Sequence, residues 1–191
     1  AFYRQFPSCE VHTVELSTTL LRLQLDAKQL DFIVDVPSPD TVTYCNELLL
    51  NEPILLAVPR SFLPRIQPQS GALELNALSG EPFILLPPEQ MLGGICQKMC
   101  EQAGFLPDLR LQCSSVERAL SLAAQQLGIT FAPLIFAQRQ FYGEELRYFH
   151  IARVETSRPL ALVYPRSSYQ SAPLKAMLEL FRIQVPKLYG L

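Results

Sequence analysis

The sequence predicts an α/β fold with two lobes, mostly parallel sheets, and two strands that act as hinges between the lobes. Strand-like apolar runs alternate with helix-like stretches along the 191 residues, which is typical of parallel α/β folds. A short phrase also occurs twice, at Glu52–Ser61 and Arg158–Ser167, and each copy is an apolar run bracketed by prolines. The copies flank a central βα segment, so the chain would leave one lobe by the first copy and return by the second.

The predicted lobes follow from these two crossings. Residues 1–57 and 163–191 form the first lobe, whose N-terminal part is expected to be truncated, and residues 58–162 form the second. A cleft between two lobes is where small ligands usually bind.

The first lobe opens as strand, helix, strand. Val11–Leu16 is predicted to be a short strand, and the hydroxyl side chains of residues 17–19 precede a helix that carries Leu20, Leu25 and Ala27 on its apolar side. Leu30–Val36 is a nearly continuous apolar run, which suits a parallel strand covered on both faces. A further short strand is predicted at residues 48–50.

The second lobe continues the alternation of strands and helices. Strands are predicted at residues 83–86, 109–113 and 129–132, and helices at about 90–103, 116–127 and 134–142. In the helix from about Gln90 to Ala103, Leu92, Cys96 and Met99 belong to one apolar stripe, which indicates a buried face. A terminal helix passes through residues 174–181.

Composition and charge exclude several function classes. The net charge is −2 and the predicted pI is near 5.7, so no basic face indicates nucleic-acid binding by this segment. The longest apolar runs fall well short of the ~20 residues needed to cross a membrane. The five cysteines are irregularly spaced and odd in number, which favours reduced thiols and a cytoplasmic location. No signal peptide is visible.

Two helix starts are the main candidate binding features. Ser114 and Glu117 have the spacing of a capping box, so Ser114 is expected to cap the helix while the Ser115 hydroxyl is left for a ligand. Alternatively, both serines only cap. Ser17 and Thr18 occupy the equivalent place in the first lobe. Free N–H groups and hydroxyls at helix starts favour a carboxylate or another small anion.

The ends of two predicted strands could also line a cleft. Asp35 and Val36 end a strand of the first lobe, and Pro87 and Pro88 follow a strand of the second, on the side where open α/β sheets bind ligands. Asp31 and Asp35 lie at i, i+4 on one strand, so a paired acid/base role is an alternative to a surface location.

No catalytic, nucleotide or metal motif is found. Cys96 and Cys100 lie on the apolar stripe, where free cysteine behaves as a small buried hydrophobe, and no second cysteine or histidine pair completes a zinc site. His12 and His150 lie near no nucleophile motif. Gly93 and Gly94 lack the other glycines of a nucleotide loop. No cofactor is expected.

Seven short segments together resemble the effector-binding domain of LysR-type transcriptional regulators. In order, they are Phe6–Pro7, Leu20–Leu25, Leu30–Val34, Leu55–Pro59, Gly80–Ile84, Gln102–Phe105 and Gly128–Pro133. The resemblance implies a periplasmic-binding-protein-like fold, a small-molecule effector held between the lobes, and a homodimer or homotetramer. DNA would be bound only through an N-terminal domain that this chain lacks, and no membrane is involved.

The resemblance also implies an effector site, residue by residue. Thr18 matches the hydroxyl residue that begins the first-lobe helix, and the other cleft-lining stretches match Asp35–Val36, Pro87–Pro88, Ser114–Val116 and Phe131–Pro133. The predicted effector-binding residues are therefore Ser17, Thr18, Asp35, Val36, Pro87, Pro88, Ser114, Ser115, Val116, Phe131 and Pro133. The resemblance implies that the chain is shortened relative to the family by the first strand and much of the helix after it. The reactive cysteine of the peroxide-sensing members falls near Met91, not at Cys100.

Three functions remain after this reading. The first is the sensor domain of a LysR-type regulator, acting by a shift between conformations and not as an enzyme. The second is a free-standing solute-binding protein of the same fold. The third is a small cytoplasmic enzyme that uses Asp31, Asp35 or Ser115; against it, no base lies next to a nucleophile.

Overall fold

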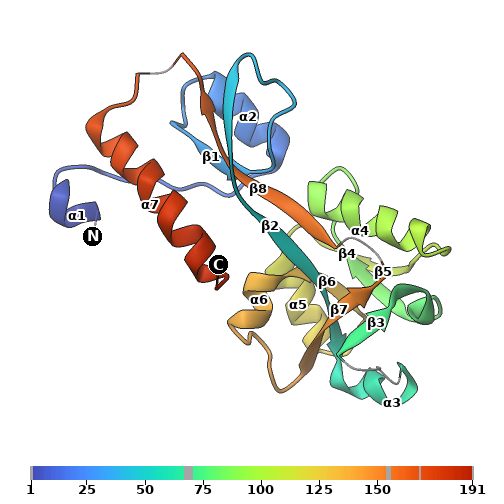
Figure 1. Ribbon diagram of the computed structural model, residues 1–191. Helices are drawn as coiled ribbons and strands as arrows, with labels where there is room; N and C mark the ends of the chain where they lie inside the picture. Colours follow the sequence, from blue (N-terminus) through green and yellow to red (C-terminus); the bar gives the residue numbers. More distant parts are fainter. Residues whose placement is uncertain (1, 67–70, 154–155, 168, 191) are drawn as a thin grey trace. The chain divides into compact units, whose positions relative to one another are not determined.

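The chain divides into two compact units. The computed structural model describes residues 2–66, 71–153, 156–167 and 169–190 (Figure 1). Unit 1 consists of Ala1–Glu52 with Arg158–Leu191, and unit 2 consists of Pro53–Ser157. Both boundaries fall inside strands, namely β2 (Tyr44–Pro59) and β8 (Ser157–Pro165), which are neighbours in their sheet. The two copies of the repeated phrase therefore begin at the two boundaries and form parts of these strands.

Unit 1 has a sheet covered by a helix on each face. Its sheet order is β1 (Ile33–Asp35), β8, β2, and β1 runs antiparallel to β8 with Val34 opposite Leu162. The helices of unit 1 are α1 (Phe2–Gln5), α2 (Thr18–Asp26) and α7 (Ala172–Leu188).

The alternation of side chains along β8 explains how both faces are covered. Ala161 and Val163 point to one face and pack with Leu25 of α2. Leu162 points to the other face and packs with Leu178 of α7. All five of these side chains are fully buried. Because successive strand residues point to opposite faces, four consecutive apolar residues at 161–164 are sufficient to hold two helix layers.

Two ion pairs tie the elements of unit 1 together. Glu52 of β2 is 1% exposed and lies 2.7 Å from both Nε and Nη2 of Arg158 on β8, and the Tyr189 hydroxyl after α7 donates to the same carboxylate. Glu47 accepts from Nε of Arg182 at 2.6 Å and from the Tyr164 hydroxyl. The hydrogen bonds from Arg182 hold the pKa of Glu47 below its usual value. A buried charge such as that of Glu52 requires a paired partner.

Unit 2 contains the remaining elements. After β2 they are η1 (Arg60–Phe62), α3 (Leu63–Ile66), β3 (Ala72–Glu74), η2 (Leu75–Leu78), β4 (Pro82–Leu85), α4 (Met91–Gln102), β5 (Asp108–Gln112), α5 (Val116–Ala124), β6 (Thr130–Pro133), α6 (Leu134–Gln138) and β7 (Leu146–Ala152). In unit 2, β2 pairs with both β6 and β7, β3 pairs with β7, and β4 pairs with β5.

A continuous apolar core fills unit 2. Leu92, Cys96 and Met99 of α4 are buried in it, which confirms the apolar stripe predicted for this helix. Phe83 of β4 and Phe131 of β6 stack with their ring centroids 6.0 Å apart and their planes at 21°. Ala119, Leu120 and Ala123 of α5 are fully buried in an adjoining cluster. The helical periodicity therefore identified the faces that turn inward.

The sheets are mixed, so the prediction of mostly parallel sheets is wrong. The pairs β1–β8, β2–β6 and β2–β7 are antiparallel, whereas β3–β7 and β4–β5 are parallel. The physical reason is the position of β2. It lies between β6 and β7 and runs opposite to both, so these two strands share a direction without pairing to each other. Strand–helix alternation alone does not reveal a strand inserted in this way.

Several predicted elements differ in extent. Residues 11–16 form no strand, and the strand predicted at residues 30–36 is reduced to β1. The short strand predicted at residues 48–50 is the middle of the long strand β2. Both β3 and β7 were missed, because polar and charged residues interrupt the apolar pattern of β7 and β3 is only three residues long.

Candidate functional site

The start of α2 presents hydroxyl groups that do not cap the helix. Ser17 occupies the N-cap position with extended backbone, yet its side chain makes no capping hydrogen bond. Thr18 is the first residue of the helix, and both side chains are half-buried. An N-cap hydroxyl usually accepts from an N–H of the first turn. Among the described residues the Ser17 hydroxyl does not cap α2, so this hydroxyl, that of Thr18 and the first N–H groups of the helix are candidates for contact with a ligand.

Arg22 joins α2 to the end of β1. Its Nη2 donates to the carbonyl oxygen of Pro37 at 3.1 Å and to that of Val36 at 3.5 Å. Its Nε is buried and has no hydrogen-bond partner among the described residues, and the same holds for Oδ2 of Asp35. Buried donors and acceptors without a partner are costly. Nε of Arg22 could therefore donate to a ligand, and Oδ2 of Asp35 could accept from one. Arg22 is held next to the end of β1 by its hydrogen bonds to the residues that follow Asp35.

The sequence interpretation missed Arg22. It lies four residues after Thr18, so the two share one side of α2. Such an arginine on an amphipathic helix is ordinarily assigned to the solvent-exposed face. The spacing from Thr18 was the available signal. Asp31, by contrast, is exposed and precedes β1, so Asp31 and Asp35 do not form a pair on one strand as the alternative interpretation required.

In unit 2, the loop of Pro87 and Pro88 lies tightly against the first turn of α4. A Cβ atom at Gly93 would lie 2.1 Å from the carbonyl oxygen of Pro87, and one at Gly94 would lie 2.9 Å from that of Pro88. Only glycine permits such a close backbone approach. The glycine pair is therefore needed to bring the end of β4 onto α4, and not for nucleotide binding.

The starts of α4 and α5 are linked, but the predicted roles of the two serines are reversed. Gln90, the N-cap residue of α4, donates from Nε2 to the carbonyl oxygen of Ser114 at 3.2 Å. The hydroxyl of Ser115, not that of Ser114, caps α5 by accepting from the N–H of Arg118 at 3.3 Å. The expectation that Ser114 caps and Ser115 is left free was wrong, because the helix begins one residue later than the capping-box spacing indicated. The exposed Ser114 is the serine whose side chain is available.

The other predicted residues of unit 2 lie mainly in its interior. Phe131 is 2% exposed and belongs to the core, Pro133 is buried, and Val116 is half-buried against the same core. Next to Phe131, the hydroxyl of Thr130 is buried without a partner among the described residues. Thr130, Phe131, Leu86 and Gly93 line a cavity of about 10 Å³, which is about the space of one water molecule.

The eleven predicted residues therefore form two groups. Ser17, Thr18, Asp35 and Val36 belong to unit 1, where Arg22 connects the helix start to the strand end. The other seven belong to unit 2, where the bond between Gln90 and Ser114 connects the starts of α4 and α5. Each group consists of helix starts and strand ends, as the sequence predicted.

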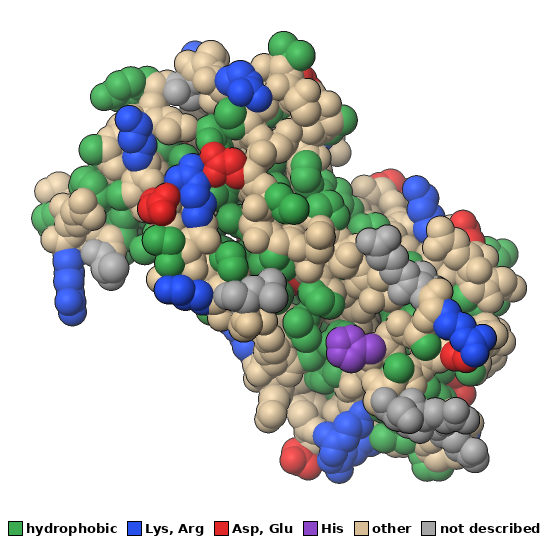
Figure 2. All heavy atoms as spheres, viewed as in Figure 1, with side chains coloured by type: hydrophobic (Ala, Val, Ile, Leu, Met, Phe, Trp, Pro, Cys, Tyr) green, Lys and Arg blue, Asp and Glu red, His purple; other side chains and the backbone are tan. Residues whose placement is uncertain are grey.

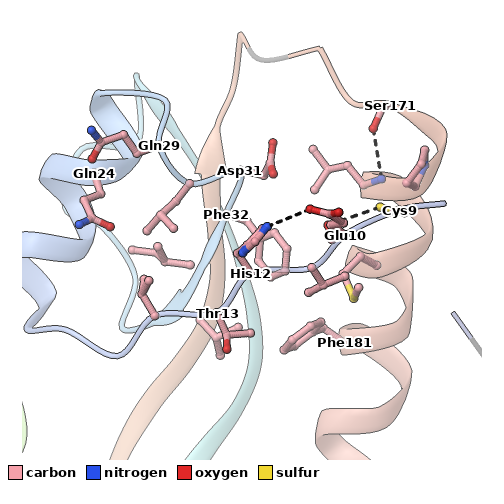
Figure 3. A pocket seen from close by; sticks show the side chains of 18 of the residues that line it. Cys9, Glu10, His12, Thr13, Gln24, Gln29, Asp31, Phe32, Ser171 and Phe181 are labelled. Atoms are coloured by element: carbon pink, nitrogen blue, oxygen red, sulfur yellow. Dashed lines mark hydrogen bonds and ion pairs between the residues drawn. The ribbon is translucent and has the colours of Figure 1, made fainter. Parts of the chain in front are cut away.

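A separate cavity of about 500 Å³ lies within unit 1. Its walls come from the segment of residues 9–14, from α2, from β1 with the residues before it, and from α7 (Figure 3). The lining is largely apolar. None of the eleven predicted residues contributes to it.

The described residues give little support for a reactive thiol at Cys100, a metal-binding site or a membrane-spanning helix. Cys100 is fully buried, and burial raises the pKa of its thiol to about 12. Over residues 2–66, 71–153, 156–167 and 169–190, no group of three or more metal-ligating side chains is found. No helix in the part of the chain that the structure describes combines the length and apolarity needed to span a membrane.

Charge is distributed without a basic patch on the visible face. Figure 2 shows Lys and Arg side chains scattered singly over that face, with Asp and Glu side chains among them. This agrees with the net charge of −2. A nucleic-acid-binding surface would instead gather basic side chains on one side.

Comparison with known proteins places the chain in one family. Residues 1–185 match the model of the LysR substrate binding domain. A curated relative, the hydrogen peroxide-inducible genes activator of Haemophilus influenzae, is 29% identical over 159 residues, which are 83% of this chain and 52% of that protein. The chain thus spans about half the length of the curated relatives it matches.

Solved structures agree with this assignment at the level of the fold. The BenM effector binding domain with its effector benzoate has a TM-score of 0.77 at 20% identity, with 99% of this chain and 84% of that chain covered. The effector binding domain of QuiR in complex with shikimate has a TM-score of 0.78 at 13% identity, with 97% and 87% covered. The match to the family model over nearly all residues, together with these folds, shows that the chain belongs to the LysR substrate-binding (effector-binding) domain family.

Proposed function

We propose that this chain is the ligand-sensing domain of a LysR-type transcription factor and that its effector is a small carboxylate. The observation that supports this ligand class is a pair of buried polar atoms in unit 1, Nε of Arg22 and Oδ2 of Asp35, that have no hydrogen-bond partner among the described residues. A ligand that brings both an acceptor and a donor would satisfy them. The uncommitted hydroxyls of Ser17 and Thr18 at the start of α2 add further donors.

The chemistry of these groups favours a carboxylate that also carries a hydroxyl or another donor. A guanidinium N–H and helix-start hydroxyls bind carboxylate oxygens well. The carboxylate of Asp35, when ionised, can only accept, so it suits a donor on the ligand. Benzoate and shikimate, bound by the two solved domains of the same fold, are both carboxylates.

The proposal retains the two lobes predicted from the sequence, residues 1–57 with 163–191 and residues 58–162. The effector would be held by helix starts and strand ends of both, including Pro87, Ser114 and the residues around Phe131. Binding would favour one arrangement of the lobes by its differential affinity for the two arrangements. DNA binding would belong to a further domain of the full-length protein, which would act in the cytoplasm as a homodimer or homotetramer.

Two other functions are less well supported. The LysR regulator domains are a non-enzymatic family, so the prediction that this chain is not an enzyme is confirmed by its family. Peroxide sensing is suggested by the name of the Haemophilus relative, a hydrogen peroxide-inducible genes activator. A peroxide sensor needs an accessible thiolate. Cys100 is buried and its pKa is raised, and the half-exposed Cys9 and Cys45 lie far along the sequence from Met91, the position near which the resemblance places the reactive cysteine.

The test is calorimetric titration of the chain with benzoate and shikimate, each compared with its uncharged amide. We expect binding of at least one carboxylate and a loss of about tenfold or more for its amide, because a hydrogen bond to a charged group contributes roughly 1.5–3 kcal/mol. Equal affinity for an acid and its amide would contradict the carboxylate assignment. If neither acid binds, benzoate and shikimate do not represent the ligand class of this domain.

Variants locate the site. Arg22→Met and Thr18→Val should each weaken binding of the acid by about tenfold. Thr19→Val is the matched control, because Thr19 is the exposed neighbour on the same helix turn, and it should leave the affinity unchanged. Ser114→Ala should weaken binding if the predicted residues of unit 2 also contact the ligand. An unchanged affinity in both Arg22→Met and Thr18→Val, with the fold confirmed by circular dichroism, would place the ligand elsewhere.

A further inference from the structure

We infer that Asn46 is a positioning residue, which holds the main chain at Ser38 in place and thereby orients the guanidinium group of Arg22. Asn46 lies in β2, and its side chain is half-buried. The inference rests on the proposed function for the role of Arg22 as a ligand contact. It adds how that contact is held in one direction before the ligand arrives.

The loop that connects β1 to β2 begins with two prolines separated by one residue. Pro37 and Pro39 carry no N–H group, and each restricts the residue before it to extended conformations. Ser38, which lies between them, is 4% exposed. Because buried main-chain N–H and C=O groups need hydrogen-bond partners, the N–H of Ser38 requires an acceptor and its C=O requires a donor from elsewhere in unit 1.

The side-chain amide of Asn46 supplies both partners. Its Oδ1 accepts from the N–H of Ser38 at 2.7 Å, and its Nδ2 donates to the carbonyl oxygen of Ser38 at 3.1 Å. Since the N–H can only donate and the C=O can only accept, one orientation of the amide satisfies both groups. β2 is paired with β8 in the sheet of unit 1, so these two bonds fasten the loop to a rigid element.

A single peptide unit joins Asn46 to Arg22. The N–H of Ser38 and the C=O of Pro37 belong to the same peptide unit, which is trans and planar. The N–H donates to Asn46, and the carbonyl oxygen accepts from Nη2 of Arg22 at 3.1 Å. In a trans peptide the N–H and C=O point in opposite directions. Asn46 therefore holds one side of the unit, and Arg22 binds the other.

The guanidinium group of Arg22 passes this orientation on to its Nε atom. The group is planar, so hydrogen bonds that place Nη2 also fix the direction of the Nε–H, which is buried and has no partner among the described residues. Without these acceptors the long side chain would regain rotamer freedom. A donor that is already ordered binds a ligand more tightly, because less freedom is lost when the ligand binds.

The alternative is that Asn46 only stabilises the loop, and the same loop offers a matched comparison. Oδ1 of Asp40 accepts from the N–H groups of Val42 and Thr43 at 3.0 and 2.9 Å. These bonds also involve the main chain of the loop, but they lie beyond Pro39. A change at Asp40 therefore loosens the loop without removing a bond to the peptide unit that faces Arg22.

The first experiment compares single variants by calorimetric titration with benzoate and with shikimate. Asn46→Ala should weaken binding by about fivefold, the effect of one hydrogen bond that is no longer well oriented. Asn46→Ser, whose hydroxyl can keep at most one of the two bonds, should give a smaller effect. Asp40→Ala should leave the affinity unchanged. So should Ser38→Ala, because the hydroxyl it removes accepts only from the N–H of Asp40. Equal losses for Asn46→Ala and Asp40→Ala would overturn the inference.

A double variant tests whether Asn46 acts through Arg22. If it does, Asn46→Ala should cause no further loss of affinity in a chain that already carries Arg22→Met, because the group that it orients is gone. Two residues that contribute independently would instead show additive losses. Additive losses in the double variant would therefore also overturn the inference.

The last measurement needs no ligand. The Nε–Hε signal of Arg22 in a ¹⁵N NMR spectrum is identified by its loss in Arg22→Met. We expect Asn46→Ala to shift or broaden this signal and Asp40→Ala to leave it in place. An unchanged Arg22 signal in a folded Asn46→Ala chain would overturn the inference.

The outcome is separable from the proposed function. If Asn46→Ala alters the Arg22 signal and neither acid binds any chain, the positioning of Arg22 stands and the carboxylate proposal fails. If an acid binds the unmodified chain and Asn46→Ala equally well, the carboxylate proposal stands and the inference about Asn46 fails.

Discussion

The two units of this chain differ in how completely their layers close. In unit 2, β2 is paired on both edges, and the core includes Phe83, Leu92 and Phe131, beside a cavity of about 10 Å³. In unit 1, the sheet ends at β1, the buried clusters are small, and a cavity of about 500 Å³ remains beside that edge. Similar alternations of strand and helix have produced one closed unit and one open unit.

This difference shows that an apolar pattern becomes a strand only when a pairing edge is present. Residues 11–16 alternate well enough to predict a strand but have no neighbour in the sheet. β5 has every residue exposed, yet it is a strand because β4 pairs with it. Main-chain pairing, not side-chain pattern alone, decided both cases.

Thiol reactivity should show the largest contrast between the units. Cys96, Cys100 and Cys113 of unit 2 are buried, whereas Cys9 and Cys45 of unit 1 are half-exposed. The pKa of Cys100 rises from 9.0 to about 12, which alone lowers its thiolate population by roughly a thousandfold. We expect hydrogen peroxide and iodoacetamide to modify Cys9 and Cys45 long before Cys100, as measured by peptide mass spectrometry.

The control for this measurement is the protein in urea, where all five cysteines should react at similar rates. Oxidation of Cys100 in the folded protein as fast as that of Cys9 would show that unit 2 is open to solvent at α4, and it would restore peroxide sensing as a candidate function.

Removing a core aromatic ring should show how much the closed unit depends on its packing. Phe83 is fully buried between the rings of Phe105 and Phe131. Phe83→Ala should lower the free energy of unfolding of unit 2 by about 3–5 kcal/mol, measured by urea denaturation. Leu109→Ala, at a side chain 48% exposed in the same unit, should change it by no more than about 0.5 kcal/mol. Similar losses for both variants would mean that the core is not as closed as described.

The buried ion pair of unit 1 should matter more than an exposed pair of unit 2. Glu52→Gln leaves Arg158 without its charge partner and should cost about 3 kcal/mol. The double variant Glu52→Leu with Arg158→Leu should lose less than the sum of its single variants, because no unpaired charge remains. Glu74 and Arg153, 44% and 81% exposed, provide the control, and Glu74→Gln should have little effect. Additive losses in the double variant would contradict the pairing.

Acid should weaken unit 1 through Glu47. The hydrogen bonds from Arg182 lower the pKa of this carboxyl from its usual value of 4.5, so its contribution to stability is complete above that value and is lost as the pH falls through the lowered pKa. Both side chains are about one third exposed, so we expect a change in Tm of roughly 1–2 °C. Glu47→Gln should remove the contribution of Glu47 to the pH dependence of the Tm. A variant with the same pH profile as the unmodified protein would rule out that contribution.

The sequence predicted the helices of the fold better than the arrangement of its strands. The stripe of Leu92, Cys96 and Met99 is local, because residues three and four apart share one helix face. The insertion of β2 between β6 and β7 is not local, because its partners lie 73 to 93 residues away in the chain. Strand order and direction depend on such distant pairings, which no single window of sequence contains.

The candidate site was predicted in outline and not in detail. Helix starts and strand ends were identified because hydroxyl and turn residues mark them. The exchange of roles between Ser114 and Ser115 depended on a shift of one residue in the start of α5, which is within the usual uncertainty of helix boundaries. The contribution of Arg22 depended on how α2 packs against β1, which appears only when the helix is docked.

The repeated phrase has a consequence for how copies of this protein recognise one another. The two copies place Glu52 and Arg158 at equivalent positions, and these two side chains pair. If β2 of one molecule associated with β2 of another in equivalent register, Glu52 would meet a second glutamate, and two β8 strands would bring arginines together. Like charges across paired strands are unfavourable. The opposite charges therefore favour pairing of the two similar strands within one molecule, and they disfavour like-with-like aggregation.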